Sequence, residues 1–180
     1  MPRDTILKIT EADLDADNFY IGTTDVSEEF DGSIEIAANL GWVRFKTSIS
    51  VKYSLLALSG SGIKAGSGIK AGWGIEAGSG IKAGDGIKAG DGIKAGSGIE
   101  AGDGIEAGDG IKAGSGIEAG LSIVSKWISS PLRIFAGLCL WRLPKPDEME
   151  IRAELRSGTI AFGTHVPPTD NKAESAGAAS

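Results

Sequence analysis

Histidine is the side chain best suited to general-base chemistry near neutral pH, and this sequence holds one, His165. A general base must come within hydrogen-bonding distance of the proton that it removes. Catalysis by His165 would therefore require the C-terminal region to fold back over a substrate. We recognise no other catalytic constellation in the sequence and do not expect an enzyme.

Aspartates recur eighteen residues apart in the middle of the chain, as the pairs Asp85 with Asp103 and Asp91 with Asp109. If strands stack with this period, the paired carboxylates lie one strand spacing apart, where a hard cation such as calcium could bridge them. Burying an unpaired charge is costly, so exposed corners with nearby lysines are the simpler arrangement. We predict exposed aspartates, no metal and no other cofactor.

Lysine and glutamate recur every six residues through the same region and sort into three columns at the eighteen-residue period. One column holds Lys64, Lys82, Glu100 and Glu118, the second Lys70, Lys88 and Glu106, and the third Glu76, Lys94 and Lys112. In the first two columns the charge changes from positive to negative along the chain, a polarity that could orient a partner. The predicted binding surface comprises Lys64, Lys70, Lys82, Lys88, Asp85, Asp91, Asp103, Asp109, Glu100, Glu106 and Glu118.

These residues belong to ten consecutive hexapeptides, from Ser61 to Gly120, of the form (Ser/Asp/Trp)-Gly-Ile-(Lys/Glu)-Ala-Gly. Repetition at a short fixed period is typical of a solenoid, in which each repeat buries its apolar residue against its neighbours. The first position of the hexapeptide repeats every three units, which aligns Ser61, Ser79, Ser97 and Ser115. The sequence therefore predicts coils of 18 residues with three short strands each. Glycine suits their corners, where the chain needs a positive φ or a close backbone approach.

This coil resembles the hexapeptide-repeat left-handed parallel β-helix, whose usual pattern is an aliphatic residue with a small residue two positions before it. Ile and Ser fit that pattern, and Asp and Trp depart from it. The resemblance implies an all-β, triangular, left-handed parallel β-helix, in which the Ser-x-Ile pairs point inward and Lys/Glu outward. Many proteins of the family transfer acyl or nucleotidyl groups, and the acyl transferases use a histidine base. A hexapeptide-repeat transferase using His165 is thus an alternative, although the repeat lacks the loop insertions that usually build such a site.

The repeat pattern extends into its flanks. Upstream, the same two inward positions are expected to be filled by Val43-x-Phe45, Ile49-x-Val51 and Leu55-x-Ala57, with Lys46 and Lys52 in the outward charged position. Downstream, Leu121-x-Ile123 adds a hexapeptide, and Trp127 falls in the column of Asp109. We divide the chain into an acidic N-terminal cap (1–42), the β-helix (43–127), a C-terminal strand/hairpin cap (128–166) and a disordered tail (167–180).

Local signals predict the structure of the caps. In the N-terminal cap we expect strands at 2–9, 18–21 and 33–37, with a helical turn at 10–13. In the C-terminal cap, Ser129-Ser130-Pro131 is expected to interrupt the strand pattern. The alternation over 148–155 and the turn residues Arg156-Ser157-Gly158 predict a hairpin that returns over 159–163.

Composition narrows the function. A net charge of −6 and a pI near 4.9 disfavour direct binding to nucleic acid or an anionic membrane. Cys139 has no partner for an internal disulfide, and its apolar neighbours over 134–143 predict a buried side chain. With no signal peptide and no apolar run of membrane-spanning length, we expect a soluble, cytoplasmic protein.

The leading interpretation is a non-catalytic β-solenoid that binds another protein, as a scaffold or an inhibitor. A second hypothesis is an acidic mimic that blocks a nucleic-acid-binding protein, since the first forty residues hold ten acidic side chains against two basic ones. A third is a self-assembling structural protein, a homo-oligomer joined through open coil ends, which expose strand backbone.

Overall fold

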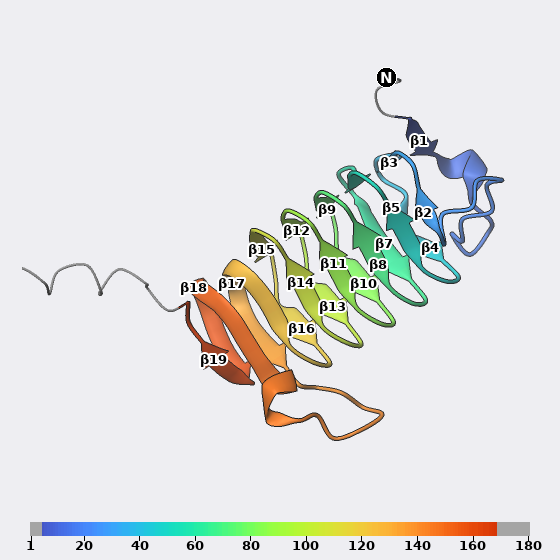
Figure 1. The fold of residues 1–180 in the computed structure, drawn as a ribbon. Coiled ribbons are helices and arrows are strands. Elements are labelled where there is room, and N and C mark those ends of the chain that lie inside the picture. The colour runs from blue at the N-terminus through green and yellow to red at the C-terminus, as the bar shows by residue number, and fades with distance from the viewer. Residues whose placement is uncertain (1–4, 169–180) are drawn as a thin grey trace, which may run out of the picture.

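The structure is a computed structural model that describes residues 5–168. Most of the predicted disordered tail, from residue 169 onward, lies outside the described residues, as do residues 1–4. The described chain forms an all-β parallel solenoid of about eight turns (Figure 1). The predicted fold class is thereby confirmed.

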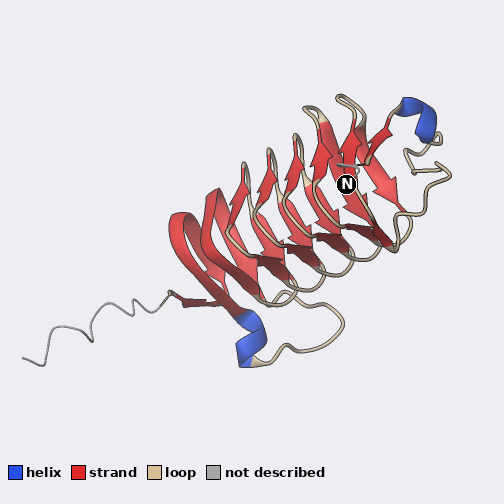
Figure 2. Ribbon diagram, turned by 45° about the horizontal axis from the view of Figure 1, so that its top comes forward, coloured by secondary structure: helices blue, strands red, loops and turns tan. Residues whose placement is uncertain are grey.

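Three strands complete each coil, and strands of successive coils pair in parallel to build three faces (Figure 2). The first face contains β4 (Gly41–Phe45), β7 (Ser61–Ala65), β10 (Ile81–Ala83), β13 (Ile99–Ala101) and β16 (Ile117–Ala119). The second contains β2 (Glu29–Phe30), β5 (Ile49–Val51), β8 (Ile69–Ala71), β11 (Ile87–Ala89) and β14 (Ile105–Ala107). The third contains β1 (Ile6–Ile9), β3 (Ser33–Ile36), β6 (Leu55–Ala57), β9 (Ile75–Ala77), β12 (Ile93–Ala95) and β15 (Gly110–Ala113).

The eighteen-residue period is confirmed by the corner hydrogen bonds. The amide of Ser79 donates to the carbonyl of Ser61 at 2.9 Å, that of Ser97 to Ser79 at 3.0 Å, and that of Ser115 to Ser97 at 3.1 Å. The predicted serine column is therefore a stacked corner, and Asp103 stacks on Asp85 in the same way, at 3.3 Å.

The pair of residues that points inward differs from the prediction. The buried pair in each hexapeptide is Ile-x-Ala, as in Ile87 (1% exposed) and Ala89 (2%), whereas the residue two before the isoleucine lies at the corner. Alanine can follow isoleucine inward because the core of a three-sided coil narrows toward its corners. Full burial of each isoleucine contributes about 1.5–3 kcal/mol.

The register of the strands upstream of the repeat also differs from the prediction. Val43 lies beside Ile63 and Arg44 beside Lys64, so Arg44, and not Lys46, continues the charged column. Likewise Ser50, and not Lys52, lies beside Lys70. The inward residues Leu55 of β6 and Ile63 of β7 are eight positions apart instead of the six of the repeat, with Gly60 at φ 77° between them, and this lengthens the coil.

The C-terminal region continues the solenoid and contains no hairpin between residues 128 and 166. A single strand, β17 (Ile123–Ala136), crosses all three faces, and β18 (Glu150–Phe162) pairs with it in parallel along its length. β19 (Thr164–Val166) then begins another coil on the second face. The predicted hairpin is wrong because the apolar residues of β18 extend the inward columns, with Ile151 beside Ile123 and Ile160 beside Ile134.

Two further C-terminal predictions need correction. Ser129-Ser130-Pro131 does not end a strand, since Pro131 lies at a register shift of β17, where it interrupts no regular pairing. Trp127 pairs with Gly110 in the strand register; its amide still donates to the Asp109 carbonyl at 3.4 Å, but the amide of Lys126 donates to the same oxygen at the shorter distance of 2.7 Å.

The N-terminal region and one loop complete the molecule. A 3₁₀ turn, η1 (Glu11–Asp13), confirms the predicted helical turn, and β1 and β3 confirm two of the predicted strands. The segment 18–21 forms isolated bridges instead of a strand. Between β17 and β18 a loop contains a second 3₁₀ turn, η2 (Pro146–Met149).

Candidate functional site

Each face of the solenoid carries a groove along its length. On every repeat strand the outward positions are the glycine before the isoleucine and the Lys or Glu after it. The glycines stack into a column without side chains, and the charged residues stack into a wall beside it. Three grooves of this kind follow from the hexapeptide itself.

The groove on the second face is the largest, with a volume of about 480 Å³, and it spans five coils from Ile49 to Val124. Its floor is the glycine column, and the Lys70, Lys88 and Glu106 side chains line it. Lys88 contacts both carboxylate oxygens of Glu106 at 2.9 Å, and Lys70 reaches Glu29 at 3.4 Å. Ser27, Ser48 and Ser50 line its N-terminal end and Ser122 its C-terminal end.

The groove on the third face has a similar volume of about 450 Å³ and ends at an aromatic ring. The Trp127 indole lies over Gly110, within 2.4 Å of where a Cβ would stand, so that only glycine fits beneath it. Lys94 forms an ion pair with Glu76 across one coil, and Lys112 also lines the groove.

The groove on the first face is smaller, at about 240 Å³, because Trp42 fills part of it. The Trp42 ring lies over Gly62 and Gly80. Lys82 pairs with Glu100, and Phe135 lies at the C-terminal end of the groove. These aromatic residues were not singled out in the sequence, although the bulky side chain of Trp42 falls beside a column of glycines once the register is known.

The predicted charged columns are confirmed as columns, but they do not gather at one place. The register aligns Lys64, Lys82, Glu100 and Glu118 on the first face, and Lys70, Lys88 and Glu106 on the second. Where the sign changes within a column, an ion pair joins the two coils. The charge pattern thus stabilises the stack and also shapes the grooves.

The four aspartates lie at two corners, as predicted for exposed side chains. Asp85, Asp91 and Asp109 are exposed and Asp103 is half-buried. Lys126 lies 2.6 Å from Asp109, and this hydrogen bond raises the pKa of the Lys126 ammonium. Within residues 5–168, no group of three or more His, Cys, Asp or Glu side chains is arranged to hold a metal ion.

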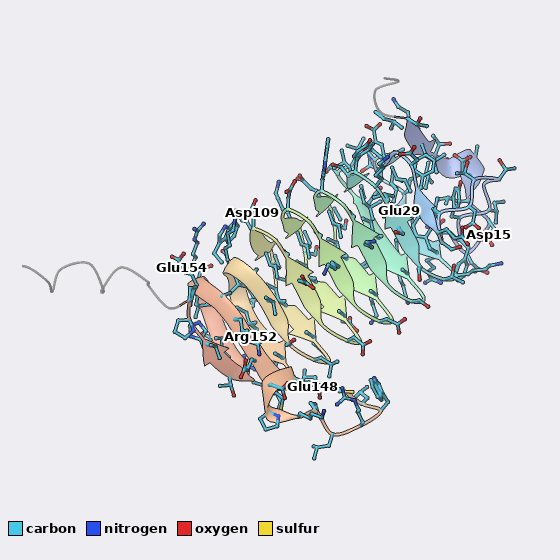
Figure 3. All side chains as sticks on the ribbon, in the orientation of Figure 1. Asp15, Glu29, Asp109, Glu148, Arg152 and Glu154 are labelled. Atoms are coloured by element: carbon cyan, nitrogen blue, oxygen red, sulfur yellow. The ribbon has the colours of Figure 1, made fainter. Side chains whose placement is uncertain are left out.

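Much of the N-terminal acidity has a local structural role. Asp13 accepts hydrogen bonds from the amide and hydroxyl of Thr10, and Asp15 accepts from the amide of Phe19 at 2.8 Å. Asp25 accepts from the hydroxyl and amide of Ser27, which lowers the pKa of the Asp25 carboxyl. Lysines pair with Glu29, Asp31 and Glu35; Figure 3 shows Asp15 and Glu29 in this region.

His165 lies on β19, near the C-terminal end of the described chain and outside all three grooves. Its Nε2 is 2.9 Å from the carbonyl oxygen of Ala153, and its side chain is exposed. Cys139 is half-buried in the loop before η2 instead of fully buried, because that loop leaves the core. The neighbouring Leu140 is 99% exposed.

Comparison of the chain with protein-family models, with curated proteins and with solved structures gives no match. Among the described residues, no helix is long and apolar enough to cross a membrane.

Proposed function

We propose that the protein is a non-catalytic solenoid that binds another protein, and that the partner lies along the second face. The observation that carries the proposal is the continuous groove across five coils, which has glycines at its base and charged side chains along its side. In a parallel solenoid the strand hydrogen bonds run along the axis between coils, so this floor offers van der Waals contact instead of strand addition.

The dimensions fit an extended peptide segment. Five coils at roughly 4.8 Å spacing give a groove about 19 Å long, which matches about six extended residues. Glycine leaves room for a partner backbone or small side chains, whereas Lys70 at one end and Glu106 toward the other favour a segment with an acidic and then a basic residue. Hydroxyls from the four serines add hydrogen-bonding groups at the two ends of the path.

The structure gives less support to an acidic mimic, because most N-terminal carboxylates cap local turns or pair with lysine. Such a mimic needs many carboxylates free to replace phosphates. Competition with DNA for a captured partner, weakening as salt rises, would still favour the mimic over the groove proposal.

Affinity capture from a cell extract, followed by identification of the captured protein, tests the proposal when paired charge variants are used. Lys88→Glu places two acids together and should weaken capture at least tenfold. Combining Lys88→Glu with Glu106→Lys restores the ion pair in reversed orientation, so the fold is retained while the two charges exchange places along the groove. The double variant should also fail to capture the partner.

Reversal of the equivalent pair on the first face, with Lys82→Glu and Glu100→Lys combined, is the matched control. It should leave capture unchanged. Equal loss from both reversals, or no loss from either, would contradict binding along the second face.

A further inference from the structure

The two ends of the solenoid both present strand edges. Within residues 5–168, β19 covers β18 on the second face alone, so β18 has no strand beyond it on the third and first faces. At the opposite end, β1 is the outermost strand of the third face and pairs only with β3 on its inner side. Figure 1 shows β1 and β19 at opposite ends of the stack. Strand edges of this kind are templates for pairing with another chain.

The free edges at the two ends lie at matching angular positions about the solenoid axis. The chain winds from the second face to the third and then to the first, as in β8, β9 and β10. The last strand, β19, lies on the second face, so the next position in the winding is on the third. β1 is a third-face strand. A second copy that is shifted along the solenoid axis without rotation therefore places its β1 at this next position.

The side chains at the two edges are suited to contact. Leu155 continues the inward column of the third face at the C-terminal end and is half-buried, and Leu7 is half-buried beside Ile34 at the other end. In β1 itself Ile6 is 50% exposed, and at the C-terminal end Phe162, on the first face of β18, is 46% exposed. Stacking one copy on another would remove these apolar groups from water.

Charge favours unlike ends over like ends. Residues 5–42 hold nine acidic side chains and one basic, whereas residues 123–168 hold six basic and four acidic. Two N-terminal ends therefore repel each other, and an N-terminal end attracts a C-terminal end.

We propose that the protein associates head to tail, with β1 of one copy added in parallel to β18 of the next on the third face. Contact between unlike ends does not close on itself and produces an open linear assembly. The assembly leaves the lateral grooves accessible, so it goes beyond the proposed partner binding and does not depend on it.

Sedimentation velocity of the full chain over a hundredfold dilution series tests the proposal. The mean mass should rise with concentration and fall with added salt, because the attraction between the ends is screened. A chain that stays monomeric at every concentration in low salt would overturn the proposal.

Two blocked-end variants test the direction. Leu7→Lys blocks the N-terminal end and Leu155→Lys the C-terminal end, so each alone should be monomeric. Their equimolar mixture should form a dimer of twice the monomer mass and nothing larger, because one intact end of each kind remains. Association lost in Leu155→Lys and kept in Leu7→Lys would indicate pairing of like ends and overturn the proposal.

Circular dichroism checks that both variants are folded. If either is not, Ile6→Arg and Arg156→Glu replace them, since both original side chains are half exposed and each change opposes the charge of its end. A chain ending at Pro168 that associates when the full chain does not would assign the edge to residues 169–180 and overturn the proposal.

Discussion

The hexapeptide coils and the C-terminal coils enclose one continuous core but turn their corners differently. In the repeat, strands are three to five residues long and each corner carries a glycine that approaches the previous coil. A Cβ on Gly90 would stand 1.9 Å from the carbonyl oxygen of Gly72. In the C-terminal coils, β17 and β18 run for 14 and 13 residues through the corners, with register shifts between them.

Glycine is therefore required for different structural reasons in the two regions. The glycines from Gly62 to Gly120, all of them described, have no positive φ, and their corner members are required by close approach between coils. Gly137, Gly158 and Gly163 do have positive φ, at 87°, 103° and 105°. A regular stack needs space between backbones, whereas irregular coils need a backbone conformation that other residues rarely adopt.

The largest effect is expected from a corner glycine of the repeat. Gly90→Ala should lower the free energy of unfolding by more than about 3 kcal/mol, because its Cβ would force two coils apart. Gly86→Ala is the matched control on a face, where the Cβ would lie 3.2 Å from the Gly104 carbonyl oxygen, and it should cost about 1 kcal/mol or less. Urea unfolding followed by circular dichroism measures both, and equal losses would refute the close-approach explanation.

The second prediction compares the core of the two regions. Ile87→Ala should destabilise the protein by about 3 kcal/mol, since Ile87 is fully buried in the middle of the stack. Ile160→Ala in β18 should cost about 1 kcal/mol, because Ile160 is half-buried near the end of the core. Thermal unfolding gives the ranking, and a larger loss at Ile160 would show that the C-terminal coils hold the stack together.

The ion pairs of the repeat should contribute little. A double-mutant cycle with Lys88→Gln and Glu106→Gln should give a coupling of about 0.5 kcal/mol, since both side chains are more than half exposed. The coupling should decrease at high salt. A salt-independent coupling above about 1 kcal/mol would show that these charges specify the stack, and not only its surface.

The smallest effect concerns the loop between β17 and β18. Hydrogen bonds from Arg142 lower the pKa of Glu148 from 4.5 to about 2. Because the folded pKa is lowered, this tether is intact above pH 4.5 and is lost as the pH falls toward 2. Trp141 fluorescence should change across that range while circular dichroism stays constant, and Trp141→Phe identifies the signal.

Glu148→Gln should show the acid fluorescence already at neutral pH. A fluorescence change that is identical in this variant would contradict the role of the Arg142 tether. Figure 3 shows Glu148 beside the C-terminal coils.

Sequence predicted the repeat better than its flanks, for a physical reason. The columns of Lys64, Lys82, Glu100 and Glu118 follow from the period alone, because identical units stack with identical spacing. The upstream register failed by two residues at the β6–β7 connection, whose extra length leaves the local hydrophobic pattern unchanged. The hairpin failed because alternating residues over 148–163 fit an antiparallel or a parallel partner equally well.

The sequence predicted only part of each groove. Their charged walls were predicted, but Trp42 and Trp127 could be placed over glycine columns only when the register of neighbouring coils was known. The hexapeptide period, together with the recurrence of its first position every three units, predicted the 18-residue coil, because equivalent residues of a solenoid stack on one another. The tertiary structure alone decided how the irregular ends join that stack and which edges they leave uncovered, because those depend on pairing between segments distant in the chain.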